Sequence, residues 1–456
     1  TRRSSDLKKS RRNFIKDASA SAVGLTMAPW ALGNSAKSYS RIIGANDRLR
    51  VAIVGLGRRL GAYYEPIALK ESNVELVYLC DVMDSQLERA SAGFAEKIDY
   101  EPKLEKDVRK IINDDQVDAI INATPDHWHT PMAIMALEAG KHVYLEKPVS
   151  HNPYESELLI QYNKKHKDKL IQMGAQQRSS DVSKEIIDEI HNGIIGEVYK
   201  ALTFYSNRRG RVVNPKIAPV PDGLNWELFQ GPAPRKPYEH DTWDYNWHWY
   251  GWDYGTAETG NNATHELDVA RWALQVGYPE YVFVEAAKRH FKDDGWTMYD
   301  TMDATFMFPD NKVIQWDGKR RNGYKTHQYG RGVYVFGTEG TVFLSRSIGY
   351  KLYDRAGELI RERMEGTDEA GTALGGGGGL STRHMLNFFN SIRGKEDLTL
   401  PISDGVVSQY MTHVANIAYR VNKPLEVNTE NGRIFDRDAM KLWKRTYEPG
   451  WEPKAL

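Results

Sequence analysis

Short apolar runs alternate with helical stretches along the first part of the chain. Two of the helices have clear starts, because Thr130-Pro131 and Asn152-Pro153 each join an N-cap residue to a proline in the first turn. Strands and helices that alternate in this way predict a parallel sheet with right-handed crossovers. Five runs have the continuous hydrophobicity of buried strands: residues 49–54, 74–80, 117–123, 142–145 and 170–173.

The later part of the chain predicts a second domain. A helix is expected over residues 181–192, and a strand over 198–205 follows it. Further strands and two closing helices come after a long gap: strands at 304–308, 312–316, 332–336 and 341–344, and helices at 384–393 and 404–421. A chain of 456 residues is long enough for two domains.

The gap is occupied by a long irregular stretch, residues 207–261, called the aromatic segment below. Flat aromatic rings stack on the apolar faces of sugars and offer polar hydrogens to hydroxyls. We therefore expect part of the segment to form the wall of a sugar site, with at least one of Trp243, Trp247, Trp249 and Trp252 in contact with it and Trp249 and Trp252 favoured. The alternative is that its rings build a small core or a subunit contact. The segment holds five of the chain's twelve tryptophans: Trp226, Trp243, Trp247, Trp249 and Trp252.

A glycine turn that suits a dinucleotide follows the first strand. Gly55 allows a tight turn, and Gly57 lets a pyrophosphate approach the backbone at the start of a helix expected to reach about residue 70. The third position of the fingerprint is imperfect, because it holds Leu60 and the glycine comes one residue later, at Gly61. The strand before and the helix after this turn predict a dinucleotide-binding domain.

The choice of dinucleotide rests on the residues around this turn. Asp81 ends the second strand, where a carboxylate binds the ribose hydroxyls of NAD and would repel a 2′-phosphate. NAD(H) is therefore favoured, while Arg58 and Arg59 leave NADP(H) as the alternative.

A lysine stands at the end of the strand predicted over 142–145. Glu146-Lys147-Pro148 follow that strand, at the edge where an open parallel sheet gathers its ligands. Next to a cationic nicotinamide, like charge and desolvation would lower the pKa of Lys147 and make it a useful base near neutral pH. The simpler interpretation is a surface salt bridge between Lys147 and Glu146.

Residues 124–129 lie at the end of another predicted strand and are expected to contact the cofactor. His127 has an alternative interpretation, since a histidine in such a loop often caps the next helix. The expected contacts in this region are Thr124, Pro125, His127 and His129, together with Glu146 and Lys147.

A later helix carries four polar or aromatic residues at spacings of four, three and four: Asn261, His265, Asp268 and Trp272. Those spacings put all four on one helix face. His265 titrates near neutral pH and is a candidate acid/base group. The alternative is a core histidine hydrogen-bonded to Asp268.

Composition excludes several other classes of protein. Lys+Arg and Asp+Glu both number 61, and a net charge of zero argues against a nucleic-acid-binding protein. One cysteine, Cys80, allows no intrachain disulfide and no cysteine-built metal site, and we expect no metal. No apolar run reaches the roughly 18 residues that a membrane-spanning helix needs.

The first residues resemble a twin-arginine export signal. Arg11 and Arg12 precede Phe14 and Lys16, and a mildly apolar stretch of small residues follows over 18–32. This pattern predicts a periplasmic or exported protein. The alternative is a retained basic arm.

The motifs taken together resemble the Gfo/Idh/MocA oxidoreductases, the relatives of glucose–fructose oxidoreductase and inositol dehydrogenase. The resemblance covers about residues 47–450 and implies a fold class of α/β plus α+β, with a Rossmann domain followed by a domain with an open, mostly antiparallel sheet. It rests on the glycine turn at 55–57, residues 124–129, Glu146-Lys147-Pro148 and the run from His265 to Trp272.

The resemblance also implies roles for individual residues. Lys147 matches the family's active-site lysine, and His265 matches its acid/base histidine. Asn261 stands where the family often has an aspartate, so it orients by hydrogen bonds but takes no proton. Asn261, His265 and Asp268 are the expected substrate contacts, together with Trp249 and Trp252.

The predicted domains are an export signal or arm over 1–46, a Rossmann domain over 47–174 and a substrate domain over 175–456. The open sheet of the substrate domain is expected to join subunits into a homo-oligomer, a dimer or a tetramer.

Three functions follow from these expectations. The first is oxidation of a secondary hydroxyl of a sugar or sugar derivative, with Lys147 and His265 as acid/base groups and a tightly bound cofactor. The second is redox-neutral glycoside cleavage, in which oxidation, elimination, hydration and reduction follow one another. The third is non-catalytic sugar binding with a structural nucleotide. Because NADH is not easily recycled outside the cytoplasm, the predicted export favours a cofactor that is restored in each cycle.

Overall fold

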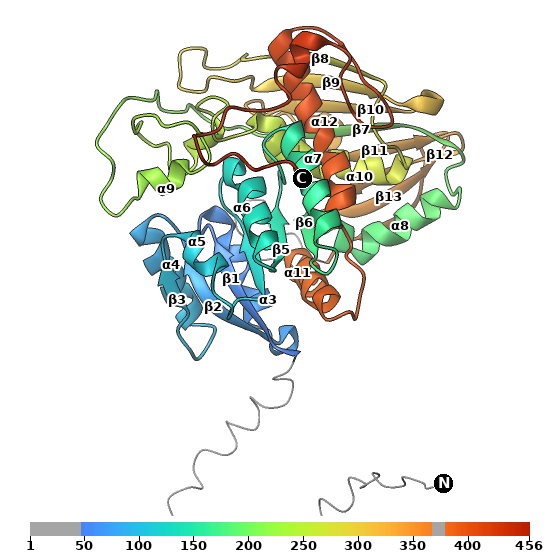
Figure 1. Ribbon diagram of the computed structural model, residues 1–456. Helices are drawn as coiled ribbons and strands as arrows, with labels where there is room; N and C mark the ends of the chain where they lie inside the picture. The colour runs from blue at the N-terminus through green and yellow to red at the C-terminus, as the bar shows by residue number, and fades with distance from the viewer. Residues whose placement is uncertain (1–46, 367–378) are drawn as a thin grey trace, which may run out of the picture. The chain divides into compact units, whose positions relative to one another are not determined.

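The N-terminal part of the described chain forms a parallel sheet (Figure 1). The computed structural model describes residues 47–366 and 379–456, so the predicted twin-arginine signal lies outside the described residues. Within them this sheet has six strands in the order β3-β2-β1-β4-β5-β6, which is the order of a Rossmann fold and confirms that prediction. The strands are β1 Leu49–Val54, β2 Val74–Cys80, β3 Lys103–Glu105, β4 Ala119–Asn122, β5 His142–Glu146 and β6 Ile171–Gly174.

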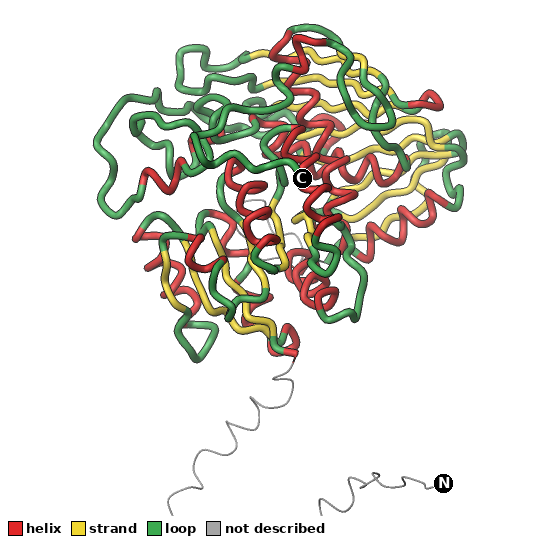
Figure 2. Tube along the Cα trace, viewed as in Figure 1, coloured by secondary structure: helices red, strands yellow, loops and turns green. Residues whose placement is uncertain are grey.

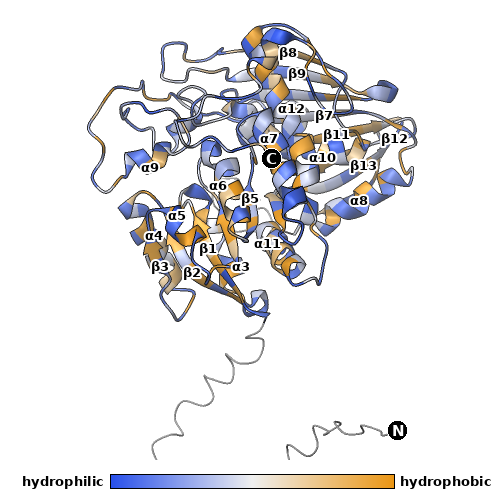
Figure 3. Ribbon diagram, in the orientation of Figure 1, coloured by the Kyte–Doolittle hydropathy of each residue, from blue (hydrophilic) through white to orange (hydrophobic). Residues whose placement is uncertain are grey.

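Helices cover both faces of this first sheet. Successive residues of a strand point to opposite faces, so Ala52 and Val54 of β1 pack with α5, α6 and α7, whereas Val51 and Ile53 pack with α3 and α4. Figure 3 shows the resulting hydrophobic colouring of the central strands. The helices are α3 Tyr64–Ala68, α4 Asp84–Ala95, α5 Val108–Ile112, α6 Asp126–Glu138 and α7 Pro153–Lys165.

Two details of the first sheet differ from the prediction. The helix expected from Gly57 to about residue 70 is broken into a 3₁₀ turn over Arg58–Ala62, α3, and a second 3₁₀ turn over Lys70–Ser72. Pro66 lies within this stretch and has no N–H to donate, which disfavours a continuous helix. Strand β3 was not predicted, because its three residues are partly exposed at the sheet edge and make no apolar run.

A second, mostly antiparallel sheet follows and confirms the expected fold class. Within the described residues it has nine strands in the order β14-β13-β12-β11-β7-β10-β9-β8-β15. Only the pair β7–β10 is parallel among these neighbours. The strands, drawn in yellow in Figure 2, are β7 Val198–Ser206, β8 Tyr281–Ala287, β9 Thr301–Met307, β10 Val313–Lys319, β11 Arg331–Gly337, β12 Gly340–Ser345, β13 Gly349–Asp354, β14 Leu359–Met364 and β15 Leu425–Glu426.

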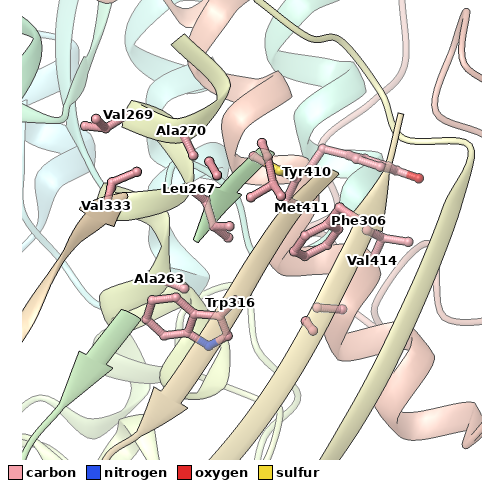
Figure 4. Close-up of a cluster of buried hydrophobic side chains, with 14 of the residues drawn as sticks. Ala263, Leu267, Val269, Ala270, Phe306, Trp316, Val333, Tyr410, Met411 and Val414 are labelled. Carbon is pink, nitrogen blue, oxygen red and sulfur yellow. The ribbon is translucent and has the colours of Figure 1, made fainter. Parts of the chain in front are cut away.

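One face of this sheet packs on helices. Leu267 of α10 and Met411 of α12 meet Phe306 and Trp316 from the sheet (Figure 4). The opposite face leaves large side chains exposed, among them Phe283 at 43% and Tyr199 at 46%. An association of subunits through this face stays a prediction. The helices of this part are α8 Asp181–His191, α9 Trp226–Gln230, α10 Thr264–Leu274, α11 Gly379–Ile392, α12 Ile402–Val421 and α13 Arg437–Met440.

Helix α11 returns from the C-terminal part to the first sheet. Met385, Phe388 and Phe389 of α11 are buried in the cluster that covers β1 on the side of α3 and α4. The predicted domain boundary at 174/175 coincides with the end of β6. The core of the Rossmann sheet nevertheless includes chain from beyond that boundary.

Candidate active site

A cavity of about 530 Å³ is lined by residues of both sheets. At one end lie the glycine turn after β1 and Asp81 after β2, and at the other lie residues of α10, β11 and the turn after β12. Because the carboxyl ends of the parallel strands meet at this cavity, the fold brings the predicted cofactor residues and acid/base residues to one place.

The glycine turn has the geometry that a pyrophosphate requires. Gly55 has a φ of +87°, and a Cβ added there would lie 2.5 Å from the carbonyl atoms of Ala123. At Gly57 an added Cβ would meet nothing within 4 Å, so the backbone borders open space. Gly55 therefore serves the packing of the turn, while Gly57 leaves room for a ligand against the backbone.

Asp81 is held in place by two backbone N–H groups. Leu56 N donates to Oδ2 at 2.8 Å, and Met83 N donates to Oδ1 at 3.0 Å. Burial raises the pKa of Asp81 to about 6 despite these bonds. Carboxylate lone pairs that remain can accept from ribose hydroxyls, as expected for an adenosine site.

The two arginines after the glycine turn both form ion pairs with carboxylates. Arg58 Nη2 lies 3.1 Å from Asp244 Oδ2 in the aromatic segment. Arg59 Nε lies 2.8 Å from Glu146 Oε1, and its charge helps to lower the pKa of Glu146. Arg59 thus positions the acid beside Lys147 instead of standing ready for a 2′-phosphate.

Only some of residues 124–129 face the cavity. Thr124, Pro125 and His129 line the cavity, and His129 Nδ1 donates to the carbonyl of Pro148 at 2.5 Å, with its Nε2 buried and without a partner among the described residues. His127 is fully buried against the carbonyl of Phe229, 2.7 Å from its Nε2. The structure thus places His127 away from the cavity where a cofactor contact was expected, because its ring packs against Phe229 and Tyr254.

Lys147 is half-buried in the cavity wall and has no carboxylate partner among the described residues. Its Nζ donates to the main-chain carbonyl of Asn261 at 2.5 Å, whereas Glu146 bonds Arg59 and the hydroxyl of Tyr63. The predicted alternative, a surface salt bridge to Glu146, is therefore not formed. Burial lowers the pKa of Lys147 to about 8, and the charges of Arg346 and Arg59 act in the same direction.

His265 lies in the first turn of α10 and is 6% exposed, on the cavity wall. Burial places its pKa well below the ordinary range, and the charges of Arg346 and Lys147 add to the effect. His265 is therefore neutral near pH 7. The alternative of a hydrogen bond to Asp268 is not formed, because Asp268 accepts from Arg178 and Ser408.

The four residues predicted on one helix face do not all reach the cavity. A π-helical stretch, Thr259–Ala263, precedes α10 and brings Asn261 to the cavity wall beside Lys147. Asp268 points elsewhere, into a buried ion pair with Arg178 at 2.8 Å. The structure thus places Asp268 away from the cavity where a substrate contact was expected, because Arg178 and Ser408 hold the carboxylate in the core.

Two of the four tryptophans expected near the sugar, Trp249 and Trp252, lie outside the main cavity. Trp249 is fully buried and stacks on Trp296 at a centroid distance of 3.9 Å. Trp252 lines a separate cavity, with Arg420 above its ring. Trp243 and Trp247, the other two of the four tryptophans from which at least one contact was expected, line the main cavity. The segment thus uses some rings as its own core, as the alternative interpretation held, and presents others to the cavity.

The aromatic segment also fastens onto the loop that follows Asp81. Asn225 N donates to Val82 O at 2.9 Å, and Asp84 N donates to Gly223 O at 3.2 Å. Lys106 Nζ donates to Gly223 O at 3.0 Å. The segment therefore lies over the nucleotide end of the cavity, which sequence analysis did not predict.

Several cavity residues were missed by sequence analysis. Three arginines line the cavity: Arg320 directly follows β10, Arg331 begins β11, and Arg346 directly follows β12. Each stands at a strand end, but a charged residue at a strand end has no distinguishing pattern unless the order of strands in the sheet is known.

Two further searches concern the described residues, 47–366 and 379–456. They contain no group of three or more His, Cys, Asp and Glu side chains placed to hold a metal ion. None of their helices combines the length and the apolar character needed to cross a membrane.

Comparison with known proteins adds two family matches. A model described as an oxidoreductase family with an NAD-binding Rossmann fold matches residues 49–174. A second, described as the C-terminal alpha/beta domain of the oxidoreductase family, matches residues 201–347.

Curated relatives match over parts of the chain. A glycosyl hydrolase family 109 protein of Saccharopolyspora erythraea is 31% identical over 204 residues, which cover 41% of this chain and 44% of the relative. An alpha-N-acetylgalactosaminidase of Shewanella oneidensis is 32% identical over 155 residues, 31% of this chain and 34% of the relative. The chain spans less than half the length of these two relatives.

A solved structure shares the fold over most of the chain. Myo-inositol 2-dehydrogenase from Lactobacillus plantarum superposes with a TM-score of 0.60 at 19% identity, and covers 84% of this chain and 100% of that one.

Proposed function

This chain belongs to the Gfo/Idh/MocA oxidoreductase family, and on that premise we propose that it oxidises a secondary hydroxyl of a sugar or sugar derivative with bound NAD(H). The observation that carries the proposal is the position of Lys147. Lys147, whose pKa is about 8, and the neutral His265 line the same cavity as the glycine turn. An alcohol oxidation needs a proton acceptor and a dinucleotide in one place.

The residues at the nucleotide end fit a dinucleotide. The open space beside Gly57 admits a pyrophosphate, and Asp81 is oriented by Leu56 and Met83 to accept from a ribose. Arg58 and Arg59 are paired with Asp244 and Glu146, which favours NAD(H) over NADP(H). When bound, the nicotinamide supplies the site with a hydride acceptor or donor.

Lys147 is the proposed base for the hydroxyl proton. With a pKa of about 8 the amine is neutral in about a tenth of the molecules at pH 7, and a neutral amine accepts a proton. The carbonyl of Asn261 holds the amine by a hydrogen bond and fixes where its lone pair points. His265, neutral and without a hydrogen-bond partner among the described residues, is free to accept or donate at a substrate oxygen.

Redox-neutral cleavage of a glycoside is the second candidate. It is favoured by the names of the curated relatives, which include an alpha-N-acetylgalactosaminidase. The aromatic segment also favours it, because its hydrogen bonds to Val82, Asp84 and Lys106 hold it at the nucleotide end of the cavity, where it would slow exchange of the cofactor. A cofactor retained through each cycle suits a reaction without net oxidation, and it would equally suit the export predicted from Arg11 and Arg12.

One experiment separates these functions from each other and from sugar binding alone. The purified protein is denatured and its supernatant analysed by HPLC for nicotinamide nucleotides, and about one equivalent of NAD(H) is expected. The native protein is then screened with nitrophenyl glycosides and free sugars, while nitrophenol release and absorbance at 340 nm are followed together.

The outcomes are distinct. A change at 340 nm with an oxidised sugar supports the oxidoreductase, whereas nitrophenol release without net change at 340 nm supports glycoside cleavage. Binding of sugars with neither signal, in protein that holds NAD(H), would refute both catalytic proposals. The Lys147→Ala variant is the control for contaminating activity.

A further inference from the structure

The substrate end of the cavity is rich in positive charge. Four of the cavity's arginines have a carboxylate partner: Arg58 with Asp244, Arg59 with Glu146, Arg320 with Glu258 at 3.4 Å, and Arg331 with Glu266 at 2.7 Å. Arg346 is different, since its side chain forms no ion pair and no hydrogen bond with any described residue. Arg346 therefore lines the cavity without a direct carboxylate partner among the described residues, while Glu266, the nearby acid, is paired with Arg331.

The position of Arg346 makes the missing partner costly. It follows β12, and the antiparallel register that pairs Val333 with Leu344 brings it opposite Arg331 when continued by two residues. Like charges on neighbouring strands destabilise a sheet. Burial and the charge of Arg331 lower the pKa of Arg346 to about 9.

Arg346 belongs to the substrate end of the cavity and not to the nucleotide end. Its charge is the largest charge effect on the pKa of His265, and it also lowers the pKa of Lys147. His265 and Lys147 are the two proposed acid/base groups. A group bound by Arg346 would therefore be attached to the sugar that those residues act on.

We propose that Arg346 binds a singly charged acidic substituent of the sugar, so that the substrate is a sugar acid or sulfated sugar and not a neutral sugar. This inference rests on the proposed function. A guanidinium offers two parallel N–H donors that match the oxygens of a carboxylate or a sulfate ester. A carboxylate or a sulfate ester carries one negative charge, whereas a phosphate monoester carries nearly two near pH 7.

The test measures binding to the protein with its own cofactor by isothermal titration calorimetry. D-Glucose and D-galactose are compared with D-glucuronate and D-galacturonate, which differ from them only at carbon 6. Glucose 6-sulfate and glucose 6-phosphate distinguish the kind of anion. One acidic sugar of a pair is expected to bind about 10- to 150-fold more tightly than its neutral partner, the range for hydrogen bonds to charged groups.

Three variants localise the effect. Arg346→Met should remove the preference, so that the acid and the neutral sugar of a pair bind within about threefold of each other, and Arg346→Lys should restore part of the preference because the charge returns without the planar fork. Arg361→Met is the matched control. It removes an arginine from β14 of the same sheet, where Arg361 pairs with Glu189 outside the cavity, and should preserve the preference.

Failure of this inference is distinguishable from failure of the proposed function. Equal binding of acidic and neutral sugars, or a loss in Arg346→Met that affects both alike, overturns the role of Arg346 even if neutral sugars are oxidised or cleaved. Selective binding of an acid that depends on Arg346, with no turnover of any sugar, supports the inference and refutes the catalytic function. Tightest binding of the phosphate would overturn the single-charge assignment.

Discussion

The two ends of the cavity are built in different ways. At the nucleotide end the backbone forms most of the site, with a tight turn at Gly55 and open space beside Gly57. At the substrate end side chains from separate elements converge: Lys147 after β5, His265 in α10 and Arg346 after β12. The first kind of site is sensitive to an added Cβ. In the second, each side chain can be replaced without changing the backbone, so the roles can be separated.

The largest effect is expected from removing the acid/base groups. Lys147→Ala or His265→Ala should lower turnover by about 10²–10⁴-fold, the usual contribution of a general acid or base. Both should keep the bound cofactor, because the nucleotide end does not depend on these side chains. Steady-state kinetics and HPLC of the released nucleotide measure the two properties. Activity within threefold of wild type in both variants would remove them from the mechanism.

A methyl group at Gly55 tests the packing of the nucleotide end. In Gly55→Ala the new Cβ would collide with the backbone of Ala123 and would sit at a positive φ, so the protein should lose about 2–4 kcal/mol of stability. Chemical denaturation of cofactor-free protein measures this loss. An unchanged unfolding midpoint would contradict the tight turn.

Gly57→Ala is the matched substitution at the same turn. Its Cβ meets nothing within 4 Å, so the cofactor-free protein should unfold as the wild type does. Room for the pyrophosphate is lost, and cofactor occupancy should fall about tenfold or more. If both glycine variants lost stability equally and kept their NAD(H), the distinction between packing and ligand room would fail.

The pH profile tests the charges at the substrate end. A neutral amine is required, so kcat/KM for oxidation should rise about tenfold between pH 7 and pH 9 as Lys147 loses its proton around pH 8. Arg346→Met removes a charge that lowers the pKa of Lys147, and should move the midpoint to higher pH. A profile that falls over this range would show that the protonated amine is the active form.

The smallest effect is expected at Asp81. Asp81→Asn keeps the shape of the side chain but weakens its acceptance from ribose hydroxyls, so affinity for NAD(H) should fall by a fewfold to about tenfold. The preference over NADP(H) should also decline, since the repulsion of a 2′-phosphate is lost. Fluorescence titration of cofactor-free protein with NADH and NADPH measures both quantities. An undiminished preference would assign the discrimination to another residue.

Sequence analysis predicted a residue's position correctly where that position follows from its neighbours in the chain. Gly55, Gly57 and Asp81 sit at the ends of strands with strong apolar patterns, and Lys147 follows such a strand directly, so their meeting at one sheet edge could be predicted. The bounds of β1 and β2 match the predicted strands.

The residues that lie elsewhere than expected are those whose position depends on packing between distant parts of the chain. The spacing of His265 and Asp268 places them near one another on α10, but only the partner, Arg178, decides that Asp268 turns into the core. Trp249 and Trp243 lie close together in the sequence. Trp249 nevertheless stacks on Trp296, which comes from a loop distant in the sequence, and is buried there. No local sequence pattern distinguishes Arg346 from other arginines. It differs from the cavity's other arginines by having no direct carboxylate partner among the described residues, and that can be seen only in the structure.

The return of α11 to the first sheet has a consequence for synthesis of the protein. Strand β6 ends at Gly174, whereas α11 begins at Gly379, so the ribosome completes all six strands long before their last covering helix exists. Until then the nascent chain exposes the apolar surface that Phe388 and Phe389 later bury. The nucleotide-binding part is therefore expected to mature after translation is nearly finished, and a fragment that stops at residue 174 should bind chaperones or aggregate.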